Sequence, residues 1–234
     1  MKKIILGSII TFTLLLVCNS CSKKDTPTNN NLTDTPTAKT QYDATNFGIY
    51  KGVFVGSSGT IIVDISNSGT FTATLKIDGV TYNFTTNQTV QINQPTTLNF
   101  SNGTNSFTFS VSANGANPTI TNLIINGHPN AAILVVKEIS TSIIKCFEGT
   151  FTGGDSGVFN AVIYNTTIKA LVRSTRASSN SIANGTITNN QISATGSVST
   201  GATFTGTLNG NSFTGTWTNA QAALNGNFSG TRTF

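Results

Sequence analysis

Charged residues are scarce in this chain of 234 residues: only 9% are Asp, Glu, Lys or Arg. A typical soluble domain carries about 25%. So low a charge density argues against a nucleic-acid-binding protein, a coiled coil and a charge-rich disordered tail. We therefore expect no nucleic acid among the partners of this protein.

Side chains that bind metals or move protons are also rare. The chain has one His, three Cys and eight acidic residues. That is little material for a metal site or for an acid–base pair. The composition therefore predicts no metal, no cofactor and no enzymatic activity.

Thr, Asn, Ser and Gly supply the polarity that charges do not, and Thr alone makes up about a sixth of the chain. Leu, Lys and Glu, which favour helices, are few, whereas the abundant Thr, Val, Ile and Phe favour strands. We expect an all-β fold built as an antiparallel meander.

The first residues have the pattern of an export signal. Two lysines precede an apolar run over residues 4–17, which is shorter than the roughly 20 apolar residues of a membrane-spanning helix. Ser20-Cys21 follows, with a small residue directly before a cysteine. In this arrangement the chain resembles bacterial lipoproteins, whose signal peptide is removed before a cysteine that carries lipid. The resemblance implies a signal peptide over residues 1–20 and lipidation of Cys21.

Residues 21–46 lack apolar periodicity and are rich in Thr, Asn and Pro. Such a composition cannot bury a core, so we expect a disordered tether between a membrane anchor and a folded body. The charged segment after Cys21 is similar to those of surface-displayed lipoproteins of the Bacteroidota, which implies an outer-membrane location. The sequence leaves the periplasmic and surface sides open. An ordinary secretory signal with unrelated cysteines is the alternative.

Two hairpins follow from the alternation of apolar and polar residues. Residues 71–77 alternate with period two, and Asp78-Gly79 suits a type I′ turn. That loop predicts the pairs Ala73–Phe84, Leu75–Tyr82 and Ile77–Val80. Farther on, a four-residue loop over 102–105 predicts the pairs Leu98–Phe109 and Phe100–Phe107.

A third hairpin is predicted around Asn209-Gly210, where large rings would lie across from small residues. This loop predicts the pairs Gly206–Phe213, Phe204–Gly215 and Ala202–Trp217. Asn-Gly also occurs at Asn102, Asn114, Asn126, Asn184 and Asn225. Turn signals at such spacing indicate a meander in a sandwich or a barrel.

A long internal repeat divides the body. Residues 50–56 align with residues 147–153, and the similarity continues through the next strands at an offset of about 97 residues. We interpret this as two homologous β units, over 47–140 and 144–234. They form small barrels or a sandwich.

Cys146 is the one thiol left once Cys21 is lipidated, so no intramolecular disulfide is expected. It lies in an alternating segment, where a small buried side chain is the plain interpretation. His128 lies in a loop and is expected to be a turn residue. An enzyme would need Cys146 and His128 within hydrogen-bond reach in a cleft.

Asp155, in a glycine-rich loop, offers a single carboxylate, whereas a calcium ion takes about six to eight oxygen ligands. Lys169, Arg173 and Arg176 form the densest basic patch, which is either a solvated face or a contact for anionic lipid or polysaccharide. Neither feature predicts a specific activity.

The candidate ligand-binding residues are Trp217, Arg232 and Phe228. Arg232 shares a strand face with Phe228 and Phe234. An inward Arg on a last strand resembles the calycin barrels, where such an Arg packs on a Trp or holds a ligand carboxylate. The resemblance implies a ligand site at one end of a barrel.

Two functions fit the sequence. The first is a non-enzymatic, lipid-anchored envelope protein whose β module binds a glycan, a small apolar ligand or an envelope protein. The alternative is a purely structural or adhesive surface module without a ligand pocket. A cavity near Trp217 and Arg232 would favour the first, and a filled interior with exposed Thr and Asn faces the second.

Overall fold

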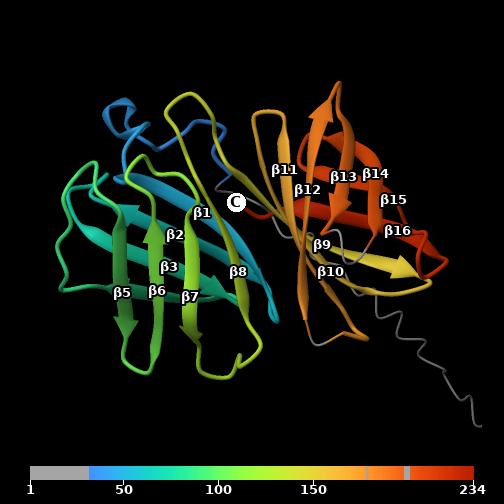
Figure 1. The fold of residues 1–234 in the computed structure, drawn as a ribbon, viewed down its shortest axis with the longest axis horizontal. Helices are drawn as coiled ribbons and strands as arrows, with labels where there is room; N and C mark the ends of the chain where they lie inside the picture. Colours follow the sequence, from blue (N-terminus) through green and yellow to red (C-terminus); the bar gives the residue numbers. More distant parts are fainter. Residues whose placement is uncertain (1–31, 178, 198–200) are drawn as a thin grey trace, which may run out of the picture. The chain divides into compact units, whose positions relative to one another are not determined.

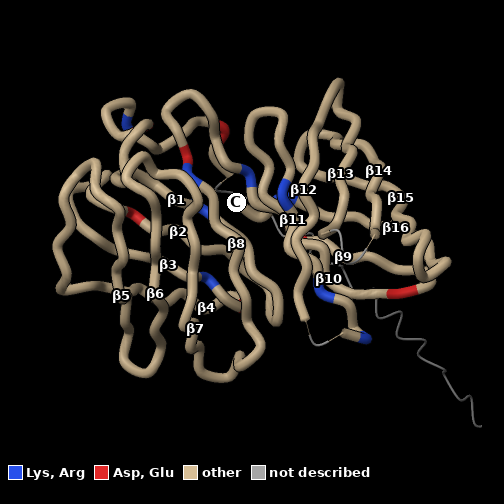
Figure 2. The backbone as a smooth tube through the Cα atoms, viewed as in Figure 1, with Lys and Arg blue, Asp and Glu red and all other residues tan. Residues whose placement is uncertain are grey.

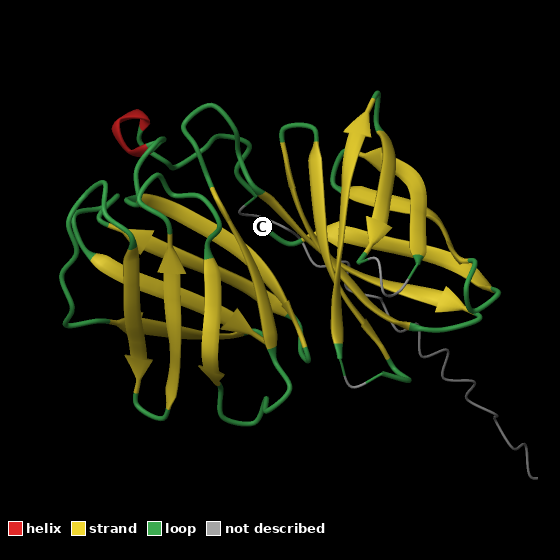
Figure 3. Cartoon of the chain, viewed as in Figure 1, coloured by secondary structure: helices red, strands yellow, loops and turns green. Residues whose placement is uncertain are grey.

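The structure is a computed structural model that describes residues 32–177, 179–197 and 201–234. Cys21, the expected signal peptide and the first part of the expected tether lie outside these residues. Among the described residues the one helical element is a 3-10 helix, η1 (Thr40–Tyr42), in a chain of strands and loops (Figure 3). No helix in the described ranges is long and apolar enough to cross a membrane.

The chain forms two tandem antiparallel β-barrel units, which confirms the all-β fold predicted from the sequence (Figure 1). The strands of the first barrel are β1 (Gly48–Val55), β2 (Gly59–Ile65), β3 (Phe71–Ile77), β4 (Val80–Thr85), β5 (Thr96–Asn102), β6 (Asn105–Val111), β7 (Thr119–Ile124) and β8 (Ala132–Lys137). Those of the second barrel are β9 (Lys145–Gly153), β10 (Gly157–Tyr164), β11 (Thr167–Ser174), β12 (Asn180–Thr188), β13 (Gln191–Gly196), β14 (Ala202–Asn209), β15 (Ser212–Asn219) and β16 (Leu224–Arg232).

The two barrels differ in closure. The first is an eight-stranded sheet in the order β7-β6-β5-β4-β3-β2-β1-β8, nearly closed, with β7 and β8 as its edges. The second is a closed barrel in which β16 pairs with β9. Two separate sheets therefore form, and the sandwich alternative is not what the chain adopts.

The internal repeat places equivalent residues at equivalent positions. Tyr50 on β1 pairs with Lys137 on β8, and its counterpart Phe147 on β9 pairs with Arg232 on β16. The last strand of each barrel thus ends on a cation at the same register position.

The β3–β4 hairpin has the predicted register, with Leu75 opposite Tyr82. Asp78 and Gly79 both have positive φ, 48° and 81°, as a type I′ turn requires. Turn chemistry and apolar alternation agree here, so local sequence was sufficient to predict the pairing.

In the β5–β6 hairpin, Phe100 lies opposite Phe107 as predicted. The pairing continues one step beyond the prediction, to Asn102 opposite Asn105. The loop therefore has two residues instead of four.

The predicted register of the β14–β15 hairpin is wrong. Its loop consists of Gly210 and Asn211 instead of Asn209 and Gly210, so Phe204 faces Trp217. Gly210 has a φ of 57° and is the first loop residue, which is the glycine position of a type II′ turn. The apolar face was predicted correctly, because the slip moves the pairing by two residues and keeps the alternation.

Two Asn-Gly pairs predicted to be turns, Asn184-Gly185 and Asn225-Gly226, lie inside strands β12 and β16. The glycines are needed there for close packing: a Cβ on Gly226 would lie 2.7 Å from Nε1 of Trp217. Rings cover strand glycines as the sequence suggested, but with other partners. These cross-strand pairs are Phe213–Gly230, Phe228–Gly215 and Trp217–Gly226.

Each barrel has its own apolar core, and β1 also packs on the second barrel. All eight residues of β1 are buried. One of its faces points into the first core, while Val53 on the other face packs with Cys146 of β9 and Val162 of β10. Apolar packing of this kind stabilises the contact between the barrels.

A buried ion pair lies at the same junction. Nζ of Lys51 is 2.5 Å from Oε2 of Glu138, and both side chains are at most 1% exposed. Burial raises the pKa of Glu138, but the hydrogen bond and charge of Lys51 outweigh it, so the pKa lies below its usual value. The N–H groups of Thr37 and Ile144 favour the carboxylate further.

Residues 33–46, which we call the strap, were expected to be part of a disordered tether. They are instead hydrogen-bonded to the body. Thr37 donates to Glu138, Lys39 donates to Asn67, and Asn46 donates to the hydroxyl of Thr96 at 2.6 Å. The prediction is wrong for residues 33–46, because their backbone and polar side chains hydrogen-bond to the body and Tyr42 packs edge-on against Phe47.

Candidate functional site

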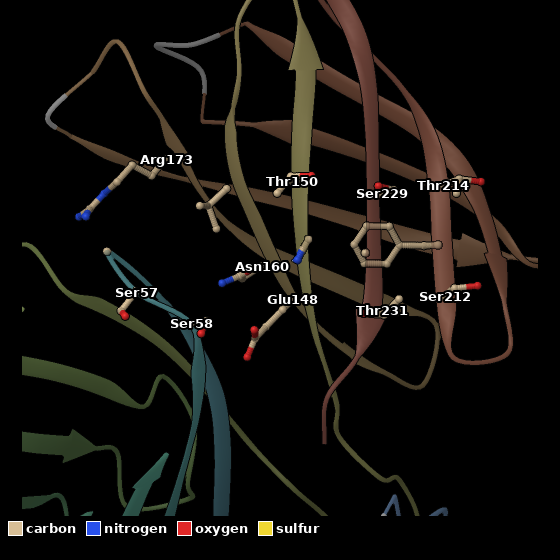
Figure 4. Close-up of a pocket in the computed structure, with 15 residues that line it drawn as sticks. Ser57, Ser58, Glu148, Thr150, Asn160, Arg173, Ser212, Thr214, Ser229 and Thr231 are labelled. Carbon is tan, nitrogen blue, oxygen red and sulfur yellow. Dashed lines mark hydrogen bonds between the residues drawn. The ribbon is translucent and has the colours of Figure 1, made fainter. Parts of the chain in front are cut away.

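A groove of about 730 Å³ lies on the outside of the second barrel, between β9, β10, β15 and β16 and the β1–β2 loop of the first barrel (Figure 4). Ligand pockets commonly occupy such junctions and have volumes of roughly 300–1,000 Å³. Glu148, Asn160 and Arg173 lie among the hydroxyls of the lining. The lining hydroxyls belong to Ser57, Ser58, Thr150, Ser212, Thr214, Ser229 and Thr231.

Asp78 holds the loop side of the groove in place. The hydroxyl of Ser57 and the backbone N–H of Ser58 both donate to its Oδ1, the second at 3.2 Å. The hydrogen bond from Ser57 holds the pKa of Asp78 below its usual value. Nε2 of His128 is 3.7 Å from Oδ2 of the same carboxylate. His128 thus lies beside the carboxylate that holds the β1–β2 loop.

Asn160 joins the two sides of the groove. It is 2% exposed on β10. Its Nδ2 donates to the carbonyl of Phe54 at 2.7 Å, and its Oδ1 accepts from the N–H of Gly149 at 2.9 Å. One amide thus fixes the end of β1 against β9.

Arg173 borders the groove from β11. Its Nε donates to Oδ1 of Asn180 at 2.6 Å, and its Nη2 donates to the carbonyl of Asn130. The loop passes so close that a Cβ on Gly56, whose φ is +91°, would lie 2.6 Å from Nη1 of Arg173. Glycine is required at this position by both the backbone conformation and the contact.

Glu148 is the carboxylate of the groove and points from β9 toward Ser58 (Figure 4). It is half-buried. Burial raises its pKa; the charge of Lys76 and the N–H of Gly59 favour ionisation, and the charge of Asp78 opposes it. An acid kept in a groove against the cost of desolvation is a candidate ligand-binding group.

Trp217 and Arg232, predicted to flank one ligand site, lie far apart along the barrel. Trp217 pairs with Gly226 on β16. Arg232 is six residues further along the same strand (226 to 232), about 20 Å at the rise of a β-strand. The structure does not bring these two side chains together.

Trp217 lies at one end of the second barrel and is 4% exposed. Its Nε1 donates to the carbonyl of Thr152 at 3.0 Å, and its ring packs edge-on against Phe151. With Phe204 it lines a cavity of about 160 Å³. A water molecule occupies about 30 Å³ in the liquid, so this cavity has room for a few waters or one small ring.

Phe228 fills the interior of the second barrel. It is 2% exposed. Its ring centroid is 4.9 Å from that of Phe159 and 5.6 Å from that of Phe213. Rings at these spacings pack as a core, so Phe228 lies within the interior packing.

Arg232 holds a segment of its own chain. It is 1% exposed, its Nη1 donates to Oδ1 of Asp34 at 2.6 Å, and its Nη2 donates to the carbonyl of Thr33. The hydrogen bond from Arg232 holds the pKa of Asp34 below its usual value. The inward Arg, expected to hold a ligand carboxylate, thus binds the carboxylate of the strap.

Cys146 and His128 have different partners. Cys146 is fully buried, and burial raises the pKa of its thiol to about 12. Its Sγ donates to the carbonyl of Gly52 at 3.6 Å, whereas His128 lies beside Asp78. A thiol of this kind is rarely ionised at neutral pH.

In the described part of the chain, no three His, Cys, Asp or Glu side chains are gathered closely enough to hold a metal ion. Oδ1 of Asp155 accepts from the N–H of Ser156 at 2.7 Å and lies 3.8 Å from Nε of Arg176. Two members of the predicted basic patch therefore have partners, Arg173 in the groove and Arg176 beside Asp155.

Glu148 is not among the site residues predicted from the sequence. The available signal was a charge reversal in the internal repeat, where Glu148 corresponds to Lys51 within an otherwise similar segment. No family model matches this chain, and no curated protein matches it either. The candidate site therefore rests on its geometry.

Proposed function

We propose that this protein is a lipid-anchored envelope protein that binds a glycan in the groove beside Glu148. The observation that carries this proposal is a raised-pKa carboxylate at the end of a groove lined by seven hydroxyls. Sugar hydroxyls both donate and accept hydrogen bonds, and so do Ser and Thr. The carboxylate adds a strong acceptor for two neighbouring sugar hydroxyls.

The groove is built before a ligand arrives. Asp78 fixes the loop, Asn160 fixes the junction, and the strands fix the remaining side chains. A preorganised site loses little conformational entropy on binding. This favours a small ligand over a partner that must reshape the surface.

A glycan-array screen of the full-length protein in detergent tests the proposal. We expect binding to at least one glycan class, and we expect Glu148→Gln to reduce that binding at least tenfold. Asp155→Asn is the matched acid-to-amide control on the same barrel and should leave binding unchanged. Loss in Asp155→Asn alone would place the ligand in the Trp217 cavity and overturn the groove assignment.

The anchor is proposed from the sequence, because Cys21 precedes the described residues. Within the described residues, the strap is hydrogen-bonded to the body from Thr33 onward. Cys21→Ser should abolish labelling with palmitate and release the protein from membranes, and Cys146→Ser should not. Persistent labelling of Cys21→Ser would refute lipidation at this cysteine.

A second candidate function is a structural or adhesive surface module. The ring-filled interior of the second barrel and its exposed Thr and Asn rows favour it. This function would bind no free glycan. The same screen separates the two candidates.

A further inference from the structure

The groove does not end at its hydroxyl-lined wall. A second depression, of about 430 Å³, continues it along β9, β15 and β16. The two depressions share Thr150, Thr214 and Ser229. The second adds Thr152, Thr216 and Asn227 to the lining. A ligand that enters the groove can therefore extend along the outer face of the barrel.

The side chains along this path form a regular grid. β-pairing aligns three rows across three strands: Glu148–Thr231–Ser212, Thr150–Ser229–Thr214 and Thr152–Asn227–Thr216. We call the second and third rows the hydroxyl track. Rows two residues apart are separated by about 6.8 Å along the strands, so the grid is roughly 13 Å long.

The track carries no charge. Residues 177–231 contain no Asp, Glu, Lys or Arg, and the tube through β12–β15 is correspondingly uniform (Figure 2). Glu148 is therefore the charged corner of an otherwise neutral grid. A charged ligand chain would lose water from its charges on the track without gaining an opposite charge there. A neutral chain has no charge to desolvate.

Rings lie directly beneath the grid. Phe213 and Phe228 point inward but belong to the linings of the two depressions. They reach the wall because Gly230 and Gly215, which face them across the strands, have no side chain. Phe213 and Phe228 are only 1% and 2% exposed, so they support the wall from the interior. The surface that faces a ligand consists of hydroxyls and glycine backbone.

From this arrangement we infer that the ligand is a linear, uncharged oligosaccharide. One end binds at Glu148, and the chain continues along the hydroxyl track to Thr216 and Asn227. This inference rests on the proposed glycan-binding function and adds ligand length and charge to it. A single sugar would use the Glu148 end alone.

The test is a length series of neutral glucose oligomers, from monomer to hexamer, in α-1,4 and β-1,4 linkage. Binding to the full-length protein is measured by calorimetry. We expect affinity to rise with length in one linkage series. Thr216→Lys should weaken the hexamer by about fivefold or more, equivalent to one lost hydrogen bond or more, and should leave the dimer unchanged.

Thr195→Lys is the matched control. Thr195 is exposed on the outer face of β13 and lies outside both depressions. The Thr195→Lys variant should bind every oligomer with the affinity of the parent protein. Both Lys variants should show the parent Tm within about 2 °C, as surface changes usually do.

The outcomes separate the inference from the function on which it rests. If Glu148→Gln weakens every oligomer but Thr216→Lys weakens none, the groove binds glycans and the track is refuted. Equal affinity for monomer and hexamer refutes the track as well. If no glucose oligomer or array glycan responds to Glu148→Gln, the proposed function itself fails.

Discussion

Glu148 combines a role in the groove with a cost to the fold. Burial disfavours its ionised form, and nearby Asp78 adds like-charge repulsion. Lys76 and the N–H of Gly59 offset only part of this, since the pKa remains raised. Because an acid at this position lowers the stability of the fold, ligand binding explains its presence better than stability does.

Glu148→Gln should therefore stabilise the free protein at neutral pH. Because the pKa of Glu148 is raised in the folded state, its carboxyl favours folding most at pH values below the ordinary pKa of 4.5. This contribution to the free energy of unfolding is lost as pH rises through the raised pKa. The variant and the parent should unfold alike near pH 4. At pH 7 the variant should be more stable by on the order of 0.5 kcal/mol, because water screens a half-exposed carboxylate. Urea titrations at both pH values measure the difference, and a less stable variant at pH 7 would contradict this account.

Arg232 is the residue that joins the end of the second barrel to the strap. Arg232→Gln should lower the free energy of unfolding by about 2 kcal/mol, because charge-assisted bonds to Asp34 and Thr33 are lost from a buried side chain. Arg176→Gln is the matched control, since its side chain is 68% exposed. Chemical denaturation measures both, and equal effects would show that the strap contact does not stabilise the fold.

At the scale of strands, the second barrel depends on glycines that face rings. Phe228 lies over Gly215, and Phe213 lies over Gly230. A side chain on such a glycine has no space, because the ring from the neighbouring strand already occupies it. The same pairs make the barrel wall thin at the groove, so core packing and the shape of the site have one cause.

Gly215→Ala should destabilise the protein by about 1–3 kcal/mol through overpacking. Its Cβ would meet the backbone carbonyl oxygen of Thr205 first and would also lie 2.5 Å from Cε1 of Phe228. Gly79→Asn is the control: Gly79 lies in a type I′ turn with nothing within 4 Å of an added Cβ, and Asn tolerates positive φ. Thermal unfolding compares the two. A Gly215→Ala variant as stable as the parent would contradict the close packing around this glycine.

At the scale of the whole molecule, the two barrels share β1 as a doubly buried strand and Lys51–Glu138 as a buried ion pair. Glu138 also accepts hydrogen bonds from the strap at Thr37 and Ala38. One carboxylate therefore links the first barrel, the strap and the start of the second barrel at Ile144.

Glu138→Ala should destabilise the protein by about 3–5 kcal/mol, since it leaves the Lys51 ammonium buried without its partner. The double variant Lys51→Met/Glu138→Leu should be destabilised less than Glu138→Ala, because it leaves no buried charge without a partner. The lowered pKa of Glu138 means that its contribution is present above the ordinary value of 4.5 and is lost as pH falls through the lowered value. The free energies of unfolding of the parent and of Glu138→Ala, measured as the pH is lowered, should therefore converge. A single variant that is no worse than the double one would contradict the ion-pair account.

Strand pairing and the division into two units could be predicted in large part from the sequence alone. Alternation over 71–77 and the Asp78-Gly79 turn predicted a pairing that the structure confirms, because both signals act over a few residues. The internal repeat likewise predicted two units. Local signals failed where two turns fit the same residues, as at Gly210, and where a glycine serves packing rather than a turn, as at Gly226.

Only the tertiary structure decided where the groove and the strap contacts lie. The groove needs Ser58 beside Glu148, and the strap needs Asp34 beside Arg232. These partners are about 90 and 200 residues apart in the chain, so no periodicity or turn rule connects them. Their meeting results from the closure of one barrel and its packing against the other, where burial of apolar surface brings polar side chains together.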